Sequence, residues 1–268
     1  MTIGDGRSEL RSFAESMAVR AGDDALAGRR RLGIGQPVVH DTKSSPTDPV
    51  TEYDRAAERL IVDAIRQSRP DDAIVGEEGA DQTGTSGLHW LVDPIDGTAN
   101  FVYDLPHWCT SIAVVDADGP LAGAVYAPVL GELFSAERGG GATLNGSPIR
   151  CSGVDQLSRA LVGTGFSDSA DRRALQGDRV ARLVREVRDI RRLGSAAIDL
   201  CLVACGRLDA YFEEHLNSWD LAAGVLIAAE AGAVTSDVAG GEATPAATVA
   251  AGPGIHVRLL ELIATLDA

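Results

Sequence analysis

The segment Asp93-Pro94-Ile95-Asp96-Gly97-Thr98 has the clearest potential for chemistry in this sequence. A short apolar run, residues 88–92, leads into Asp93, and Asp96 follows three residues later. Two carboxylates held this close repel each other unless a cation lies between them. Hard divalent cations prefer oxygen ligands, and the backbone carbonyl of Ile95 could serve beside the two side chains. The segment therefore indicates a candidate metal site.

The last two residues of this segment could bind an anion. Gly97 lets the backbone approach a ligand closely, and the N–H groups of Gly97 and Thr98 would form an anion site if a helix begins here. Metal ligands beside a phosphate-binding backbone are the arrangement of a metal-dependent phosphatase. For the hexapeptide alone, an ordinary turn is an equally good interpretation, because Asp-Pro and Asp-Gly are common turn dipeptides.

Four further acidic residues stand next to predicted elements. Glu77 and Glu78 end a short strand, while Asp54 and Asp220 lie in the first turns of helices. Each has a simple explanation by itself, as a solvated pair or as an acid favoured by the helix dipole. Their occurrence together with the hexapeptide, in one order along the chain, is what favours a shared site.

Helices and strands alternate along the chain, which predicts a mixed α/β fold in packed layers. Residues 33–49 form a polar loop, and we expect two halves, 1–150 with most metal ligands and 151–268 with Asp220 and the wall of the substrate pocket. Apolar periodicity predicts helices at 8–32, 52–67, 172–187, 195–205, 219–231 and 255–266. Shorter apolar runs predict strands at 73–76, 88–92, 110–115, 121–127, 132–136, 160–163, 208–212 and 247–251.

The composition restricts the class of protein. The 268 residues carry a net charge of −15, which disfavours direct contact with nucleic acid or anionic membranes. No apolar run approaches the length of a membrane span, and the first ten residues do not resemble a secretory signal. The four cysteines lack the spacing of a zinc site, so we expect free thiols and a cytoplasmic location.

Taken together, the motifs resemble those of the inositol monophosphatase family, including its bacterial SuhB-type members, over about residues 40–252. The two signature segments correspond to 90–101 and to 219–224 followed by 230–233. Three shorter matches are the segments Lys43-Ser44-Ser45-Pro46-Thr47-Asp48-Pro49-Val50-Thr51, Gly76-Glu77-Glu78 and Gly194-Ser195-Ala196-Ala197. The resemblance implies a layered αβαβα sandwich of the inositol monophosphatase and fructose-1,6-bisphosphatase type, and a homodimer.

The resemblance also implies roles for individual residues, with two to three Mg²⁺ ions per site. Glu77, Asp93 and the Ile95 carbonyl would hold the first ion. Asp93, Asp96 and Asp220 would hold the second, and a weaker third would lie near Glu77. The implied catalytic residues are Asp54, Thr98 and Glu77, with Thr98 hydrogen-bonded to Asp54 and orienting the attacking water.

The implied substrate is a small phosphorylated polyol, most simply inositol 1-phosphate. The amides of Gly97 and Thr98 would bind its phosphate, and the alcohol part would meet Gly194, Ser195, Ala196, Glu213 and Asp220. Fructose 1,6-bisphosphate, histidinol phosphate and nucleotide 3′-phosphates remain alternatives. A SuhB-like protein-binding role in transcription is a second, compatible hypothesis.

Three basic residues near these motifs have no assigned role. Lys43 could approach the metal site or remain solvated. Arg191 and Arg192 could lie at the pocket rim, at a subunit interface or on a plain surface. The sequence alone leaves these possibilities open.

Overall fold

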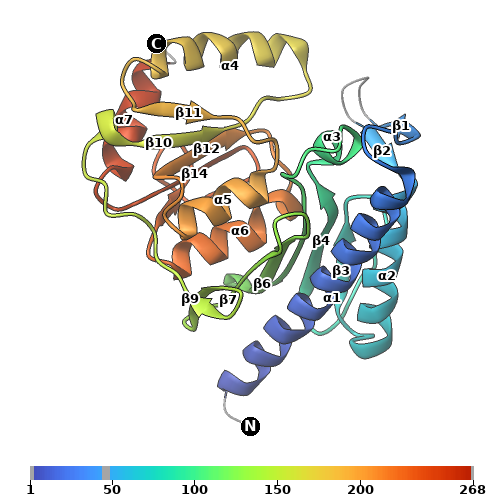
Figure 1. The fold of residues 1–268 in the computed structure, drawn as a ribbon. Coiled ribbons are helices and arrows are strands. Elements are labelled where there is room, and N and C mark those ends of the chain that lie inside the picture. Colours follow the sequence, from blue (N-terminus) through green and yellow to red (C-terminus); the bar gives the residue numbers. More distant parts are fainter. Residues whose placement is uncertain (1–2, 44–48, 267–268) are drawn as a thin grey trace.

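The computed structural model describes residues 3–43 and 49–266, which form five layers of helices and sheets (Figure 1). Two helices cover one face of a seven-stranded sheet, two more helices lie between this sheet and a five-stranded sheet, and a final pair covers the outer face of the second sheet. The expected αβαβα sandwich is confirmed.

The outer helices of the first half are α1 (Ile3–Leu32) and α2 (Glu52–Ser68). Both have apolar faces that pack on the first sheet, where Trp90 and Ile61 are completely buried. The sheet has the order β3-β4-β5-β6-β7-β8-β9, with β3 and β4 parallel and every later pair antiparallel. Its strands are β3 (Ala73–Gly76), β4 (His89–Asp96), β5 (Cys109–Asp116), β6 (Gly119–Ala127), β7 (Glu132–Glu137), β8 (Gly141–Leu144) and β9 (Ser147–Pro148).

The middle layer consists of α5 (Ala196–Ala204) and α6 (Ser218–Glu230), which lie between the two sheets. Small residues let this layer pack closely. A Cβ added at Gly123 of β6 would lie 3.1 Å from the Cα of Ala223 on α6, and one at Gly224 would overlap Leu200 of α5. The scarcity of aromatic residues is thus matched by a core of closely spaced small and aliphatic side chains.

The second sheet has the order β11-β10-β12-β14-β13 and mixes parallel and antiparallel pairs. Its outer face is covered by α4 (Ala170–Leu183) and α7 (His256–Leu266). The strands are β10 (Leu161–Thr164), β11 (Asp189–Arg191), β12 (Ala210–Glu214), β13 (Val234–Ser236) and β14 (Ala247–Ala251). The remaining elements are β1 (His40–Thr42), β2 (Pro49–Thr51), α3 (Thr98–Val102) and the 3₁₀ turn η1 (Leu157–Arg159).

The predicted elements are present, with several shifted ends. The strand expected at 88–92 continues through Asp96. The loop expected at 33–49 contains the strand β1 and ends where its partner β2 begins, at Pro49. The strands β8, β9, β11 and β13 were not predicted, because they are short or lack a clear alternation of apolar residues. Residues 44–48 of the predicted loop motif lie outside the described residues.

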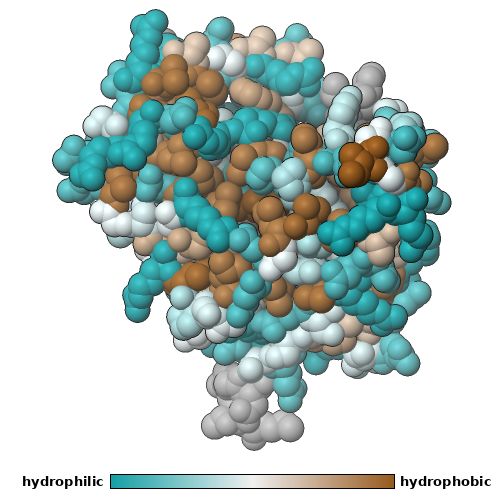
Figure 2. All heavy atoms as spheres, viewed as in Figure 1, coloured by the Kyte–Doolittle hydropathy of each residue, from teal (hydrophilic) through white to brown (hydrophobic). Residues whose placement is uncertain are grey.

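The surface and the cysteines agree with the composition. Hydrophilic and apolar residues are interspersed across the face shown in Figure 2. In the part of the chain that the structure describes, none of the helices combines the length and apolar character needed to span a membrane. All four cysteines are free thiols, as expected.

Candidate active site

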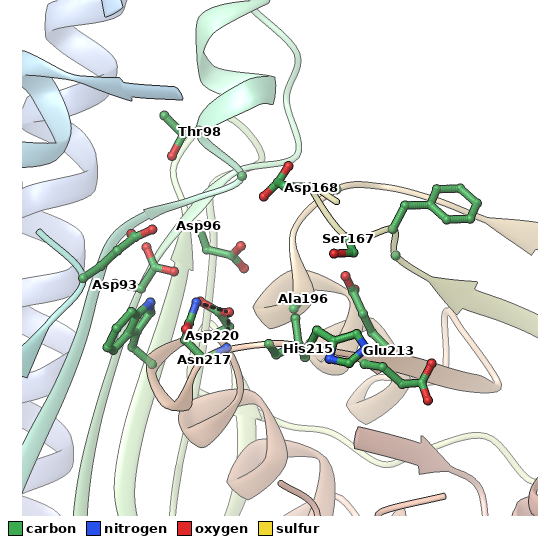
Figure 3. Close-up of a pocket in the computed structure, with 18 of the residues that line it drawn as sticks. Asp93, Asp96, Thr98, Ser167, Asp168, Ala196, Glu213, His215, Asn217 and Asp220 are labelled. Atoms are coloured by element: carbon green, nitrogen blue, oxygen red, sulfur yellow. Dashed lines mark hydrogen bonds between the residues drawn. The ribbon is translucent and has the colours of Figure 1, made fainter. Parts of the chain in front are cut away.

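A cavity of about 720 Å³ opens between the two sheets and collects residues from both halves of the chain (Figure 3). Asp93, Asp96 and Asp220 lie toward one side of it, and Glu213 lies toward the other. Ten of the predicted site residues line this cavity: Glu77, Asp93, Ile95, Asp96, Gly97, Thr98, Gly194, Ala196, Glu213 and Asp220. Two others, Asp54 and Ser195, are buried behind its wall, with exposed fractions of 0% and 2%.

Asp93 and Asp96 are delivered by the end of β4, which does not turn at Pro94 as a plain turn dipeptide would. The pairing of β4 with β5 shifts between Asp93 and Asp96, so an irregularity lies at the proline. Proline has no N–H to donate to the sheet, which explains why the ladder is interrupted there. The free carbonyl of Pro94 is satisfied by the hydroxyl of Thr110, at 2.9 Å. The strand therefore holds both carboxylates rigidly at the sheet's end.

Gly97 makes the turn from β4 into α3. Its φ of +91° lies in the left-handed region, where a side chain is strained, and a Cβ there would lie 2.9 Å from the carbonyl oxygen of His107. The helix α3 begins directly afterwards at Thr98, as the anion-site interpretation required. Gly97 and Thr98 both line the cavity.

Thr98 is linked to Asp54, which reaches the site from the first turn of α2. The Thr98 hydroxyl lies 3.1 Å from Oδ1 of Asp54 and 2.9 Å from the carbonyl oxygen of Ile95. The other carboxylate oxygen of Asp54 accepts the N–H of Thr51 at 2.8 Å and its hydroxyl at 2.5 Å. This capping box fixes the carboxylate, and burial raises the pKa of Asp54 to about 6.

Glu77 and Glu78 are positioned by Glu58, a residue that sequence reasoning missed. Its carboxylate accepts the backbone N–H groups of Glu78 at 2.8 Å and Ala80 at 3.1 Å, and so holds the turn after β3. Glu58 lies one turn after Asp54 on the buried face of α2. An acidic residue on an otherwise apolar face was the signal that could have revealed it.

Lys43 contacts the acidic end of the cavity. Its ammonium group lies 2.8 Å from Oε1 of Glu77 and also pairs with Glu78. Burial by itself lowers the pKa of Lys43, but the pairing with the two glutamates outweighs it and raises the pKa above its usual value. The sequence left open whether Lys43 approaches the site or is solvated, and the structure shows that it contacts Glu77 and Glu78.

Asp96 joins β4 to α5. One of its carboxylate oxygens accepts the hydroxyl of Ser195 at 2.6 Å and the N–H of Ala197 at 2.8 Å. Ser195 is the N-cap of α5, and its oxygen also accepts the N–H of Ile198 at 3.2 Å. The Ser195 hydroxyl is thus engaged with a carboxylate of the site and with its own helix. Burial raises the pKa of Asp96, while the hydrogen bonds from Ser195 and Ala197 at the start of α5 act in the opposite direction.

Asp220 occupies the first turn of α6, where its carboxylate accepts the N–H of Asn217 at 2.7 Å (Figure 3). Burial raises the pKa of Asp220 to about 8, and the charge of Asp96 adds to this effect. The pKa of Asp93 lies well above its usual value, first because of burial and then because of the charge on Glu77. Without a cation these carboxylates destabilise one another's charged forms.

The carboxylate cluster suits divalent cations by the chemistry of its donors. Among the described residues, Oε2 of Glu77 and Oδ1 of Asp93 are buried without a hydrogen-bond partner. Unpaired buried carboxylate oxygens are costly unless a cation or proton compensates them. Within residues 3–43 and 49–266, no group of three or more Asp, Glu, His or Cys side chains is close enough together to hold a metal ion without rearrangement. Instead, Lys43 neutralises part of the charge.

Glu213 forms the opposite wall of the cavity. It lies two residues after Tyr211 on β12, and the Tyr211 hydroxyl donates to Oε2 of Glu213 at 2.6 Å. The carboxylate fits against Gly165, because a Cβ at that position would overlap it. Burial raises the pKa of Glu213 to about 7, so it changes protonation near neutral pH. The cavity therefore joins a metal-compatible end to a wall that can hydrogen-bond hydroxyl groups.

The match to known proteins decides the family. The model of the inositol monophosphatase family matches residues 7–267. The chain belongs to the inositol monophosphatase family. It is 47% identical to the inositol-1-monophosphatase SuhB of Mycobacterium tuberculosis, over 94% of this chain and 92% of that protein. It is also 43% identical to the Nus factor SuhB of Salmonella typhimurium, over 76% of this chain and 77% of the other.

A solved structure gives the same result for the fold. The inositol monophosphatase of Thermotoga maritima superposes with a TM-score of 0.86 at 34% identity, covering 95% of this chain and 96% of the other. Membership in this family makes the chain a phosphatase, as the sequence motifs predicted. Its substrate and the roles of its individual residues are separate questions.

Proposed function

We propose that this protein is a Mg²⁺-dependent phosphatase that hydrolyses inositol 1-phosphate to myo-inositol and phosphate. The observation that carries the proposal is the cluster of buried carboxylates with unpartnered oxygens, which shares one cavity with the Thr98 hydroxyl. A phosphate monoester carries nearly two negative charges, so these carboxylates would repel it unless cations neutralised them. Substrate binding should therefore require Mg²⁺.

The proposed metal ligands are Glu77, Asp93, Asp96, Asp220 and the Ile95 carbonyl. Glu77, Asp93 and Ile95 would hold one ion, Asp93 would share the second with Asp96 and Asp220, and a weaker third would bind near Glu77. Bound Mg²⁺ would neutralise phosphoryl oxygens, lower the pKa of the attacking water and stabilise the leaving alkoxide. We propose two to three ions per site.

Side chains and backbone groups of the protein would position the attacking water and the phosphate. Thr98, held by Asp54 at 3.1 Å, would orient the water that attacks phosphorus. The water forms a new P–O bond, the bond to the alcohol oxygen breaks, and that oxygen leaves with a proton derived from the water. Glu77 supports this step as a ligand beside the water. The N–H groups of Gly97 and Thr98 would bind the phosphate.

We assign recognition of the polyol to the cavity wall that lies opposite the proposed metal ligands. Glu213 can accept hydrogen bonds from hydroxyl groups when ionised, and Gly194, Ala196 and Asp220 line the cavity between it and the metal end. Ser195 would contribute through its neighbours, since its hydroxyl is bonded to Asp96. Fructose 1,6-bisphosphate, histidinol phosphate and nucleotide 3′-phosphates are alternative substrates of the same chemistry.

A protein-binding role is a second candidate function, favoured by the 43% identity to a relative named as a Nus factor. Binding to the transcription machinery is compatible with catalysis. We also propose that the protein is a cytoplasmic homodimer, and that its chain divides into two halves, residues 1–150 and 151–268. A pulldown that survives loss of the metal ligands would support the binding role.

The decisive experiment is a panel of phosphate monoesters assayed with and without Mg²⁺. We expect inositol 1-phosphate to have the highest kcat/KM and no turnover in the presence of EDTA. Turnover of another ester at much higher kcat/KM would show that this ester, and not inositol 1-phosphate, is the preferred substrate. Turnover that is independent of divalent cations would refute the proposed chemistry.

A further inference from the structure

One residue of the cavity wall has a backbone conformation that is uncommon for residues with a side chain. His215 has a φ of +65°, in the left-handed region, where a Cβ is strained. It follows the last residue of β12 and lines the same cavity as Glu213. Figure 3 shows its imidazole on the same side of the cavity as Glu213, away from Asp93. The proposed reaction gives this side chain no role.

The fold requires a sharp turn at this position. Only residues 215–217 connect β12 to α6. On one side, the N–H of His215 donates to the carbonyl oxygen of Ala246 at 3.2 Å. On the other side, the N–H of Asn217 donates to the carboxylate of Asp220 at 2.7 Å. Glycine would make this turn without strain, so the backbone alone does not explain a histidine here.

The two other residues that have a side chain and a positive φ, within the part of the chain that the structure describes, use their side chains to hold the fold. Asp104 accepts the N–H of Gly35 at 3.4 Å and pairs with Arg29 at 3.4 Å. Asn145 bonds to two backbone groups near the start of β7, at 2.8 and 3.0 Å. The imidazole of His215 is exposed and makes no hydrogen bond or ion pair with the other described residues. The strain at His215 is therefore not compensated by a structural contact of its side chain, which is the pattern of a residue that serves a ligand.

The imidazole complements the carboxylate of Glu213. An ionised carboxylate only accepts hydrogen bonds, whereas a neutral imidazole has one N–H donor and one acceptor nitrogen. The hydroxyl of Tyr211 cannot supply the missing donor, because it already donates to Glu213 at 2.6 Å. Each hydroxyl group of a polyol both donates and accepts. Two adjacent hydroxyl groups can thus be bound together, one donating to Glu213 and the other accepting from His215.

We propose that His215 is a specificity-determining residue, whose imidazole N–H donates to a hydroxyl oxygen of the alcohol part, next to the hydroxyl group that Glu213 binds. The substrate class that fits is a phosphate ester of a cyclic polyol or sugar with adjacent hydroxyl groups. The proposal rests on the proposed function, because it needs the phosphate at the metal end and the alcohol part at the opposite wall. Histidine at this position thus gives up some stability for selectivity.

The kinetic test compares inositol 1-phosphate with cyclohexyl phosphate, whose ring carries no free hydroxyl group. His215→Gly should lower kcat/KM for inositol 1-phosphate about 5- to 10-fold, the effect of one hydrogen bond, and change the value for cyclohexyl phosphate less than about twofold. His215→Asn should show the same loss, because asparagine also tolerates the left-handed conformation but has a shorter side chain. A loss in the glycine variant alone would assign the effect to backbone flexibility and overturn the proposal, as would equal changes for the two substrates.

Thermal unfolding in EDTA tests whether the ring has a structural role instead. His215→Gly should leave Tm unchanged or raise it, because glycine adopts the left-handed conformation freely. Asn145→Gly is the matched control, in which the loss of two hydrogen bonds should lower Tm by about 2–4 °C and leave both kcat/KM values unchanged. A fall in Tm of the same size in His215→Gly would show that the imidazole stabilises the fold, and would overturn the proposal.

A binding measurement separates this proposal from the proposed function. The methylenephosphonate analogue of inositol 1-phosphate, in which a CH₂ group replaces the ester oxygen, should bind the Mg²⁺-loaded protein more tightly than cyclohexylmethylphosphonate by calorimetry. His215→Gly should reduce the ratio of the two affinities about 5- to 10-fold. If no phosphate ester is hydrolysed but the ratio depends on His215 in this way, the proposed function fails and the assignment of His215 stands. If inositol 1-phosphate is hydrolysed and the ratio is unchanged in the variant, the reverse holds.

Discussion

Replacement of Gly165 by alanine should separate polyol recognition from phosphate chemistry. A Cβ at this position would lie well inside 3.0 Å of the Glu213 carboxylate, closer than Cβ atoms approach other heavy atoms. The carboxylate must then move by about 1 Å, and misplacement on this scale costs about 100-fold in rate. Loss of one hydrogen bond from a substrate hydroxyl to an ionised Glu213, worth about 1.5–3 kcal/mol, corresponds to about 10- to 150-fold, a range that includes this value.

The assay compares kcat/KM for inositol 1-phosphate with that for p-nitrophenyl phosphate, whose alcohol part carries no ring hydroxyls. We expect a fall of about 100-fold for the first substrate and less than about threefold for the second. Gly177→Ala in α4 is a matched control, because a Cβ there has no heavy atom within 4 Å. Equal losses on both substrates, or an unchanged value for inositol 1-phosphate, would refute the assignment of Glu213.

Three other predictions address the metal end and the pH dependence. Asp93→Asn should lower kcat/KM with saturating Mg²⁺ by at least about 1,000-fold, because we propose that this carboxylate binds two ions; near-normal turnover would contradict this sharing. Thr98→Ala should lower kcat about 100-fold while Thr98→Ser retains most activity, measured by phosphate release; equal activity of the two variants would exclude a role for the hydroxyl. Burial raises the pKa values of Asp54 to about 6 and Glu213 to about 7. Between about pH 4 and 7 the folded state therefore binds more protons than the unfolded state, so the Tm of protein in EDTA should fall as pH rises through this window; a rise would show that these groups are not buried as acids.

The sequence was informative where chemistry imposes a local pattern. The order of Glu77, Asp93, Asp96 and Asp220 predicted a shared site, and all four line one cavity. The helix predicted from residue 52 begins at Glu52. Strong 3.6-residue periodicity made the long helices predictable. Their ends shifted by a few residues because caps, rather than apolar residues, set helix boundaries.

Other features depend on contacts that a single sequence does not reveal. Glu58 acts through backbone groups 20 and 22 positions away, and Ser195 turns its hydroxyl to Asp96, which is 99 positions distant. The short edge strands β1 and β11 are stabilised by pairing with neighbours, so they leave little local signal. The continuation of β4 through Pro94 was hidden because proline normally ends a strand.

The close packing around α6 has a consequence for how this enzyme can change. Asp220 stands on a helix whose separation from the first sheet is set by hydrogen atoms at Gly123, and whose separation from α5 is set by those at Gly224. A single methyl group at either glycine would push the helix outward and move Asp220 away from Asp93. If Asp220 holds Mg²⁺ as we propose, the affinity for Mg²⁺ should depend on this spacing and should respond to substitutions at residues that contact no metal ion. Glu213 lies on the separate strand β12, so the proposed polyol-binding wall can change in sequence while the proposed metal ligands keep their positions.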